Sequence, residues 1–179
     1  MNAKQSPAVH IRTATTADAP ALLEIYRPYV ETTAVSFELR VPSIEEFAGR
    51  ISVAVAGWSW LVAVAGGRPV GYAYASTHRT REAYRTSVET SAYVHQDCFR
   101  QGIGRALYTQ LLKELGERGF ASAFAGITLP NPASVGFHES LGFQPIGVFP
   151  RVGRKFGRWH DVAWFYRPIP SRHSPDGAP

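Results

Sequence analysis

A glycine turn between a predicted strand and a predicted helix is the part of the sequence best suited to bind an anion. Its residues are Arg100, Gln101, Gly102, Ile103, Gly104 and Arg105. The two glycines leave the backbone unshielded, so consecutive N–H groups can close on a negative group at the positive end of the helix that follows. A Walker loop would need Lys-Ser/Thr at positions 105 and 106, and a dinucleotide fingerprint would need a glycine at 107; the chain has neither. An ordinary glycine turn before a helix remains the alternative.

Glu89 is the candidate general base. In the segment 87–94, Val88 and Thr90 alternate with Glu89 and Ser91, which predicts a strand with Glu89 and Ser91 on one face. A strand glutamate is by default a solvated edge residue. This strand, however, leads directly into the glycine turn, so Glu89 is placed to take a proton beside a bound anion.

A cationic segment precedes this strand. Residues 78–85 read HRTREAYR and include Arg79, Arg81 and Arg85. They form either a solvated loop or a mouth that binds a carboxylate, since the forked guanidinium group matches two carboxylate oxygens. Phe37 lies in the predicted connection 31–41, where it either packs or contacts a substrate.

Composition restricts the class of protein. A chain of 179 residues with 45% hydrophobic and 18% charged residues is typical of one compact soluble domain. It has no apolar run long enough to span a membrane, and its N-terminus lacks a signal-peptide core, so we expect a cytoplasmic protein without a membrane partner. The single Cys98 cannot form an intrachain disulfide, and the six histidines lack metal-ligand spacing, so no metal is expected.

The net charge of +5 has two explanations. Nucleic acid is one candidate partner, but the arginines are spread in short groups and no predicted helix has a continuous basic face. Anionic small molecules account for the same charge. We therefore expect a small-molecule partner and no nucleic acid.

Periodicity and capping residues predict an α/β (α+β) fold. Helices are expected after Thr15 or Thr16, where Pro28 limits the length, after Ser43, and after Asn131. A further helix follows the glycine turn. Alternating or apolar runs predict seven strands at residues 9–13, 60–64, 69–76, 87–94, 120–129, 144–149 and 159–167.

The C-terminal half supplies the expected crossover. The segment 120–129 is largely apolar, as a strand buried on both faces would be, and forms a parallel unit with 87–94. A basic loop at 151–158 is predicted to join the last two strands. We expect one domain at 9–169, a flexible leader at 1–8 and a disordered tail at 170–179.

With these elements in place, RQGIGRALY at 100–108 and NPASVGFHESLGF at 131–143 resemble the GCN5-related N-acetyltransferase (GNAT) superfamily. The resemblance implies a mixed, mostly antiparallel seven-stranded sheet with a central splayed parallel pair and about four flanking helices. It also implies acetyl-CoA as cosubstrate, its pyrophosphate on the turn and its pantetheine arm between the splayed strands. The implied coenzyme contacts are Ala92, Tyr93, Val94, Arg100, Gln101, Gly102, Ile103, Gly104, Arg105, Asn131 and Ser140.

Several further motifs resemble the phosphinothricin and methionine sulfoximine acetyltransferases. They are SFE at 36–38, VETSAYV at 88–94, LPNPAS at 129–134, HESLGF at 138–143 and GRWHDV at 157–162. The similarity implies an amino-acid site containing Phe37, Arg79, Thr80, Arg81, Glu89, Thr90 and Ser91. One position departs from the family, because Phe99 stands where Arg or Gln is usual. We expect rearranged coenzyme contact there, not loss of the site.

The chemistry implied is transfer of acetyl to the α-amine of a small amino acid analogue. Glu89 would take the amine proton, and a backbone N–H of Tyr93 or Val94 would stabilise the oxyanion. His138 stands where many superfamily members have a tyrosine that protonates the thiolate, so we assign it as acid, or as base if Glu89 only binds. The family also implies a homodimer.

Three alternatives remain from the sequence. The enzyme could acetylate another small amine, such as a polyamine, or a protein N-terminus. The fold could be a coenzyme-binding regulatory module without turnover. A nucleic-acid-binding domain is the third, and it would require steeply salt-dependent affinity.

Overall fold

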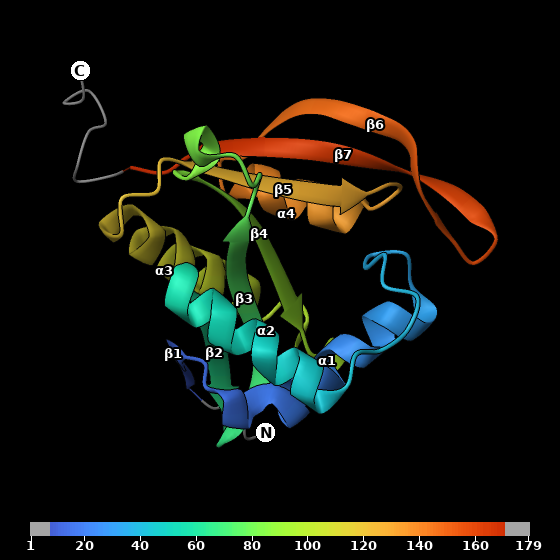
Figure 1. The fold of residues 1–179 in the computed structure, drawn as a ribbon. Helices are drawn as coiled ribbons and strands as arrows, with labels where there is room; N and C mark the ends of the chain where they lie inside the picture. Colours follow the sequence, from blue (N-terminus) through green and yellow to red (C-terminus); the bar gives the residue numbers. More distant parts are fainter. Residues whose placement is uncertain (1–7, 171–179) are drawn as a thin grey trace, which may run out of the picture.

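The structure, a computed structural model, describes residues 8–170. The predicted leader and tail therefore lie, apart from Ala8 and Pro170, outside the described residues. One seven-stranded sheet runs through the described chain in the order β1-β2-β3-β4-β5-β7-β6 (Figure 1). The strands are β1 Val9–Thr13, β2 Trp60–Ala65, β3 Arg68–Thr77, β4 Ser87–Val94, β5 Ser122–Thr128, β6 Gln144–Lys155 and β7 Arg158–Pro168.

The pairing confirms the predicted mixed sheet. Every neighbouring pair is antiparallel except β4 and β5, which are parallel. Their pairing covers only Ser87–Glu89 of β4 and Ser122–Phe124 of β5. Beyond that point the two strands diverge, as Figure 1 shows, and the fork between them is the central feature of the fold.

Four helices cover the two faces of the sheet. They are α1 Ala19–Thr32, α2 Ile44–Gly57, α3 Ile103–Glu117 and α4 Pro132–Ser140, with short 3-10 turns η1 Thr16–Asp18, η2 Glu82–Tyr84 and η3 Gln96–Cys98. Helices α1 and α2 bury one apolar cluster against β2 and β3, which includes Leu22, Ile51 and Trp60. Helix α3 buries a second cluster on the other face, with Leu107 and Leu111 fully inaccessible. The two faces of the sheet are therefore covered by different helices, α1 and α2 on one face and α3 on the other.

Local sequence signals set several boundaries as predicted. Ser43 accepts a hydrogen bond from the Glu46 N–H at 3.1 Å, while the Glu46 carboxylate accepts from the Ser43 N–H at 2.8 Å. These two bonds form the capping box that starts α2. Asn131 caps α4 by accepting from the Ser134 N–H at 3.1 Å. The β2–β3 hairpin turns at Gly66 and Gly67, with φ of 56° and 76°.

Three expectations about the elements are wrong. Helix α1 continues through Pro28 to Thr32, and the hydroxyl of Thr32 donates to the Pro28 carbonyl at 2.7 Å. Strand β5 is buried on one face only, through Ala123, Ala125 and Ile127, because Gly126 and Thr128 on its other face line a cavity of about 260 Å³. The predicted basic loop 151–158 instead belongs to β6 and β7, which continue to a tight turn at Phe156 and Gly157 with φ of 50° and 73°.

Within residues 8–170, no helix is long and apolar enough to cross a membrane. In the same range, no group of three or more His, Cys, Asp or Glu side chains could hold a metal ion. Cys98 is a half-buried free thiol.

Candidate active site

The glycine turn presents the start of α3 to one end of the fork. Gly102 is the N-cap of α3 with φ of 78°, a left-handed conformation that suits glycine. Its carbonyl accepts the first helical hydrogen bond, from the Ala106 N–H at 3.0 Å. The N–H groups before Ala106 consequently have no partner inside the helix and point toward its N-terminal end. Arg100, also at positive φ of 62°, precedes them, so donors and positive charge meet at one place.

Side chains from separate segments meet around this turn. The guanidinium of Arg105 donates to the Ser140 hydroxyl at 2.9 Å, so α3 and the end of α4 are joined at the predicted coenzyme site. A Cβ at Gly104 would lie 3.2 Å from the ring of Phe137, which shows how closely the two helices approach. Gln101 donates to the Asp97 carbonyl at 3.1 Å. The unusual Phe99 is 52% exposed and is therefore not part of the core.

Backbone polar groups of β4 line the fork. The His95 N–H donates to the Val70 carbonyl of β3 at 2.8 Å. Because backbone groups of an antiparallel strand alternate in direction, the N–H and C=O groups of Val94 and Ala92 point the other way, into the fork. The Val94 carbonyl accepts from the Tyr29 hydroxyl at 2.7 Å, which fixes this end of the strand. Of the two predicted oxyanion donors, Val94 thus faces the fork, whereas the N–H of Tyr93 is directed at β3.

Glu89 lies at the point where β4 and β5 separate. It is paired with Phe124, its side chain is 36% exposed, and its Oε1 lies 3.1 Å from Nδ1 of His78. The imidazole of His78 stacks on the Phe124 ring with centroids 4.3 Å apart. Sequence analysis grouped His78 with the cationic segment but missed its pairing with Glu89. The carboxylate is therefore both accessible and oriented.

The remaining predicted acceptor residues lie in the segment before β4 and on its two faces. Arg79, Thr80 and Arg81 follow His78 directly and are exposed. Ser91 shares the face of Glu89. Thr90 does not, because it is 4% exposed on the opposite face and its hydroxyl donates to the Phe124 carbonyl at 3.2 Å.

His138 is buried behind the fork, away from Glu89. Its Nδ1 lies 2.8 Å from the Ser134 carbonyl, and since a carbonyl only accepts, Nδ1 carries the proton. Nε2, 3.0 Å from the Tyr108 hydroxyl, then accepts that hydroxyl's proton. Burial lowers the pKa of His138. Burial raises the pKa of Tyr108, and hydrogen bonding with Thr90 partly offsets that rise. Thr90, Tyr108 and His138 thus form a buried polar row under the fork.

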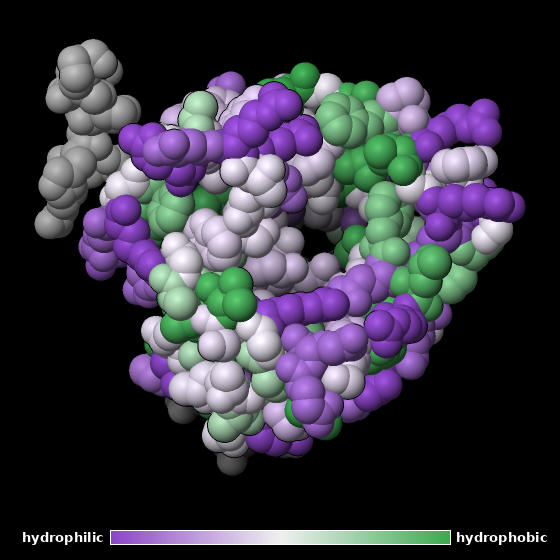
Figure 2. Space-filling view, viewed as in Figure 1, coloured by the Kyte–Doolittle hydropathy of each residue, from purple (hydrophilic) through white to green (hydrophobic). Residues whose placement is uncertain are grey.

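Two cavities open on the Glu89 face. One of about 260 Å³ lies between the α1–α2 loop and the strands beyond the fork, lined by Val35, Phe37, Gly126, Thr128, Phe149, Val152, Val162 and Trp164. A larger, aromatic cavity of about 490 Å³ lies between α2 and β2–β3 and reaches Ser76, the cross-strand partner of Glu89. Figure 2 shows the molecule hollowed on this side, between the region of α1 and α2 below and β6 and β7 above.

A parallel strand pair that opens beside a free helix N-terminus defines a fold able to hold an extended, anionic coenzyme. Residues 11–164 match the family described as an acetyltransferase (GNAT) domain. The chain belongs to this GNAT family and is an acetyltransferase.

Individual relatives agree. The chain is 39% identical over 168 residues to the phosphinothricin N-acetyltransferase of Streptomyces viridochromogenes, covering 92% of each chain. It is 38% identical to the L-methionine sulfoximine/L-methionine sulfone acetyltransferase of Pseudomonas aeruginosa, covering 92% of this chain and 98% of the relative. It superposes with a TM-score of 0.86 and 37% identity on a phosphinothricin acetyltransferase from Sinorhizobium meliloti solved in complex with AcCoA, covering 90% of this chain and 88% of that one.

Proposed function

We propose that the protein transfers the acetyl group of acetyl-CoA to the α-amine of a small amino acid analogue such as L-phosphinothricin, methionine sulfoximine or methionine sulfone. The observation that carries the proposal is the position of Glu89, an accessible carboxylate at the fork with exposed arginines just before it in the chain. The names of the relatives at 39% and 38% identity support this acceptor class.

The chain's own groups fit the coenzyme. The unpaired N–H groups of Gly102, Ile103, Gly104 and Arg105 suit a pyrophosphate, with Arg100 and Gln101 beside them. Ala92, Tyr93 and Val94 border the fork along β4, and Asn131 and Ser140 approach from α4. Bound acetyl-CoA supplies the acetyl group as a thioester.

The acceptor's amine must lose a proton before it attacks. Glu89 takes this proton directly or through water, and His78 holds the carboxylate in place. Arg79 and Arg81 bind the acceptor's carboxylate, while Thr80, Ser91 and Phe37 surround the rest of the molecule. The N–H of Val94 stabilises the oxyanion, a contribution of roughly 3 kcal/mol for a single donor.

His138 protonates the departing thiolate through Tyr108, whose hydroxyl hydrogen bonds Nε2. The resting ring is neutral, so it first takes up a proton from solvent at Nε2. It passes this proton to the Tyr108 oxygen as Tyr108 gives its own hydroxyl proton to the thiolate, and the ring returns to its neutral form. The lowered pKa of His138 favours the release of this proton.

A homodimer is proposed on the exposed face and edge of the C-terminal hairpin. Strand β6 is an edge strand, and long apolar edges pair readily with other chains. The exposed apolar side chains on it, on its turn and at the start of β7 are Ile146, Val148, Phe149, Val152, Phe156 and Trp159. Light scattering of the purified protein tests this assembly. The cytoplasmic location, and the absence of nucleic-acid and membrane partners, stay predictions.

Thiol release from acetyl-CoA tests the function, measured against phosphinothricin, methionine sulfoximine, methionine sulfone, common amino acids, spermidine and a peptide. We expect rapid turnover confined to the first three. Turnover confined to spermidine or the peptide would reject the acceptor class. Tight acetyl-CoA binding by calorimetry with no turnover of any acceptor would reject the hypothesis of acetyl transfer to these acceptors and favour a coenzyme-binding regulatory module.

A further inference from the structure

The tip of the β6–β7 hairpin bends toward the loop 33–41, which joins α1 to α2 (Figure 1). The pairing of β6 with β7 is interrupted at residues 150–152. There Arg151 has φ of 51°, and its N–H donates to the carboxylate of Asp161 at 2.8 Å. Because a bulge bends the strand that carries it, the tip at 153–160 leaves the line of the strands and reaches the loop.

Lys155 fastens the tip to the start of this loop. Only 3% of the residue is exposed, and its ammonium donates to the Val30 carbonyl at 2.6 Å and to the Ser36 carbonyl at 2.7 Å. Val30 lies in the last turn of α1, where carbonyls lack helical partners and a cation stabilises the negative end of the helix. A buried ammonium without acceptors is strongly unfavourable. The position of Lys155 and the path of the loop therefore depend on each other.

Gly153 makes room for Phe37 at the same junction. A Cβ at Gly153 would collide with the Phe37 ring, although Gly153 has an ordinary backbone conformation. The Phe37 ring also lies near His160, with ring centroids 6.1 Å apart. The hairpin tip thus forms a seat for Phe37 that only glycine at 153 permits.

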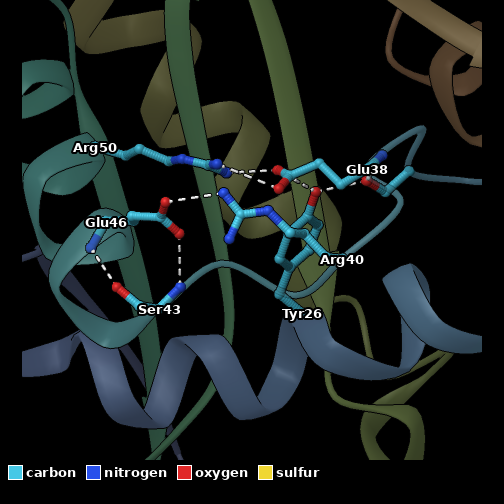
Figure 3. A network of polar contacts seen from close by, with 7 residues as sticks. Tyr26, Glu38, Arg40, Ser43, Glu46 and Arg50 are labelled. Atoms are coloured by element: carbon cyan, nitrogen blue, oxygen red, sulfur yellow. Dashed lines mark hydrogen bonds and ion pairs between the residues drawn. The ribbon is translucent and has the colours of Figure 1, made fainter.

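A second set of contacts holds the loop from the side of the helices (Figure 3). The two terminal nitrogens of the Arg50 guanidinium in α2 donate to the two carboxylate oxygens of Glu38, Nη2 to Oε2 at 3.2 Å. The Tyr26 hydroxyl donates to Oε1 of Glu38 at 3.0 Å. Arg40 donates to Glu46 at 3.2 Å. The loop is consequently anchored on α1 and α2 at 38–40, and on the hairpin at Ser36 and Phe37.

Phe37 and Val35 form the loop's wall of the cavity of about 260 Å³. The opposite wall includes Gly126 and Thr128, which follow Phe124 by two and four residues on β5 and therefore share its face, the face of Glu89. The cavity lies beside the proposed base, at the place where an acceptor's side chain would extend.

We propose that Lys155 is a positioning residue that sets the length of acceptor the enzyme accepts. It does so by holding the loop 33–41 on the hairpin tip, where Phe37 closes the cavity beyond Glu89. The acceptor class is an α-amino acid with a short side chain, and a longer chain would have to displace Phe37. This inference rests on the proposed acetyl transfer to an amino acid analogue.

The test compares Lys155→Met with Lys113→Met. Lys113 is exposed on α3, on the other face of the sheet, so the control makes the same chemical change away from the loop. The acceptors are L-methionine sulfone and its S-butyl homologue. In Lys155→Met we expect KM for methionine sulfone to rise about tenfold or more, because the acceptor is no longer held in place by Phe37. The preference for the shorter sulfone should fall at least about fivefold, because the cavity is no longer closed at its far end. KM for acetyl-CoA should stay within about twofold.

Gly153→Ala provides a second variant that leaves Lys155 in place. Its added methyl displaces Phe37, so we expect the same loss of length preference, while Gly57→Ala, with open space around its Cβ, leaves the preference unchanged. Equal losses for both coenzyme and acceptor in Lys155→Met, or an unchanged preference in a folded Gly153→Ala, would overturn the proposal.

Hydrogen exchange separates this proposal from the proposed function. If wild type turns over neither sulfone, the acceptor class fails while the loop can still be examined. Amides of residues 33–41 should then exchange faster in Lys155→Met than in Lys113→Met. Identical exchange in the two variants would show that Lys155 does not hold the loop.

Discussion

The proposed coenzyme side and the proposed acceptor side of this enzyme are built in different ways. The proposed coenzyme side comes mostly from one continuous stretch, β4, the glycine turn and α3, and it offers mainly backbone N–H groups. The proposed acceptor side is assembled from the loop 33–41, the segment 78–85, and the strands β5 to β7, and it offers side chains. Backbone donors do not depend on residue type, whereas side chains from separate segments can be substituted to suit an acceptor. The two sides should therefore fail separately when mutated.

Removing the arginines should give the largest separable effect on the acceptor side. Replacing both Arg79 and Arg81 by Ala removes charge-assisted bonds to the acceptor's carboxylate, and we expect kcat/KM for methionine sulfone to fall about a hundredfold. KM for acetyl-CoA should change little. Steady-state kinetics with each substrate varied measures both, with Arg68→Ala, exposed on β3, as control. An equally large rise in KM for acetyl-CoA would show that the two sides do not fail separately.

Gly102→Val is the corresponding change on the coenzyme side. A β-branched residue at φ of 78° is strained, so the turn should rearrange and lose aligned N–H donors. We expect KM for acetyl-CoA to rise about tenfold, with KM for the acceptor within about twofold. Gly57→Ala is again the control. Normal coenzyme affinity in a folded Gly102→Val would show that these amides do not form the anion site.

The buried row under the fork should reveal itself in stability. Burial lowers the pKa of His138 from its ordinary value of 6.5. Below pH 6.5 the unfolded chain therefore binds a proton that the folded chain does not, and stability falls as the pH drops from 6.5 toward the folded pKa, by at most about 1.4 kcal/mol per pH unit. Urea unfolding between pH 5 and 7.5 should show that the free energy of unfolding changes less with pH in His138→Gln than in wild type. The exposed His10→Gln should keep the wild-type slope, and a slope unaltered by His138→Gln would contradict the assignment.

A small effect is expected at the junction of α3 with α4. Arg105 is exposed, so its hydrogen bonds to Ser140 contribute little to stability. Arg105→Met should raise KM for acetyl-CoA about threefold and leave the unfolding midpoint unchanged within error. The rise should shrink at high salt, which kinetics at two ionic strengths can show. A rise that is independent of salt would assign Arg105 a packing role.

Sequence predicted the local turn and helix caps better than the long-range contacts around the proposed acceptor side, for a physical reason. The glycine turn, the Ser43 capping box and the Asn131 cap are fixed by neighbours a few residues away, so their residue types are informative alone. Lys155 contacts carbonyls 125 and 119 residues away, and nothing in the local pattern GRKFG distinguishes it from a solvated lysine.

The acceptor residues show the same limit. The alternation of β4 correctly placed Glu89 opposite Thr90, but the stacking of His78 on Phe124 depends on the parallel pairing of distant strands. The arginines at 151–158 suggested a loop because their charge hides the extended pairing of β6 with β7, which tertiary contacts impose. Residues that act across the fork could be found only once the strands were in place.

The single-turnover rate of Glu89→Gln with acetyl-CoA already bound and saturating methionine sulfone tests the central claim most directly. Removing a general base at the fork should slow acetyl transfer about 10² to 10⁴-fold. Calorimetry on the same variant should give the wild-type Kd for acetyl-CoA, because Glu89 lies on the acceptor face. A rate within about twofold of wild type would contradict the account, since the proton would then leave the amine by another route.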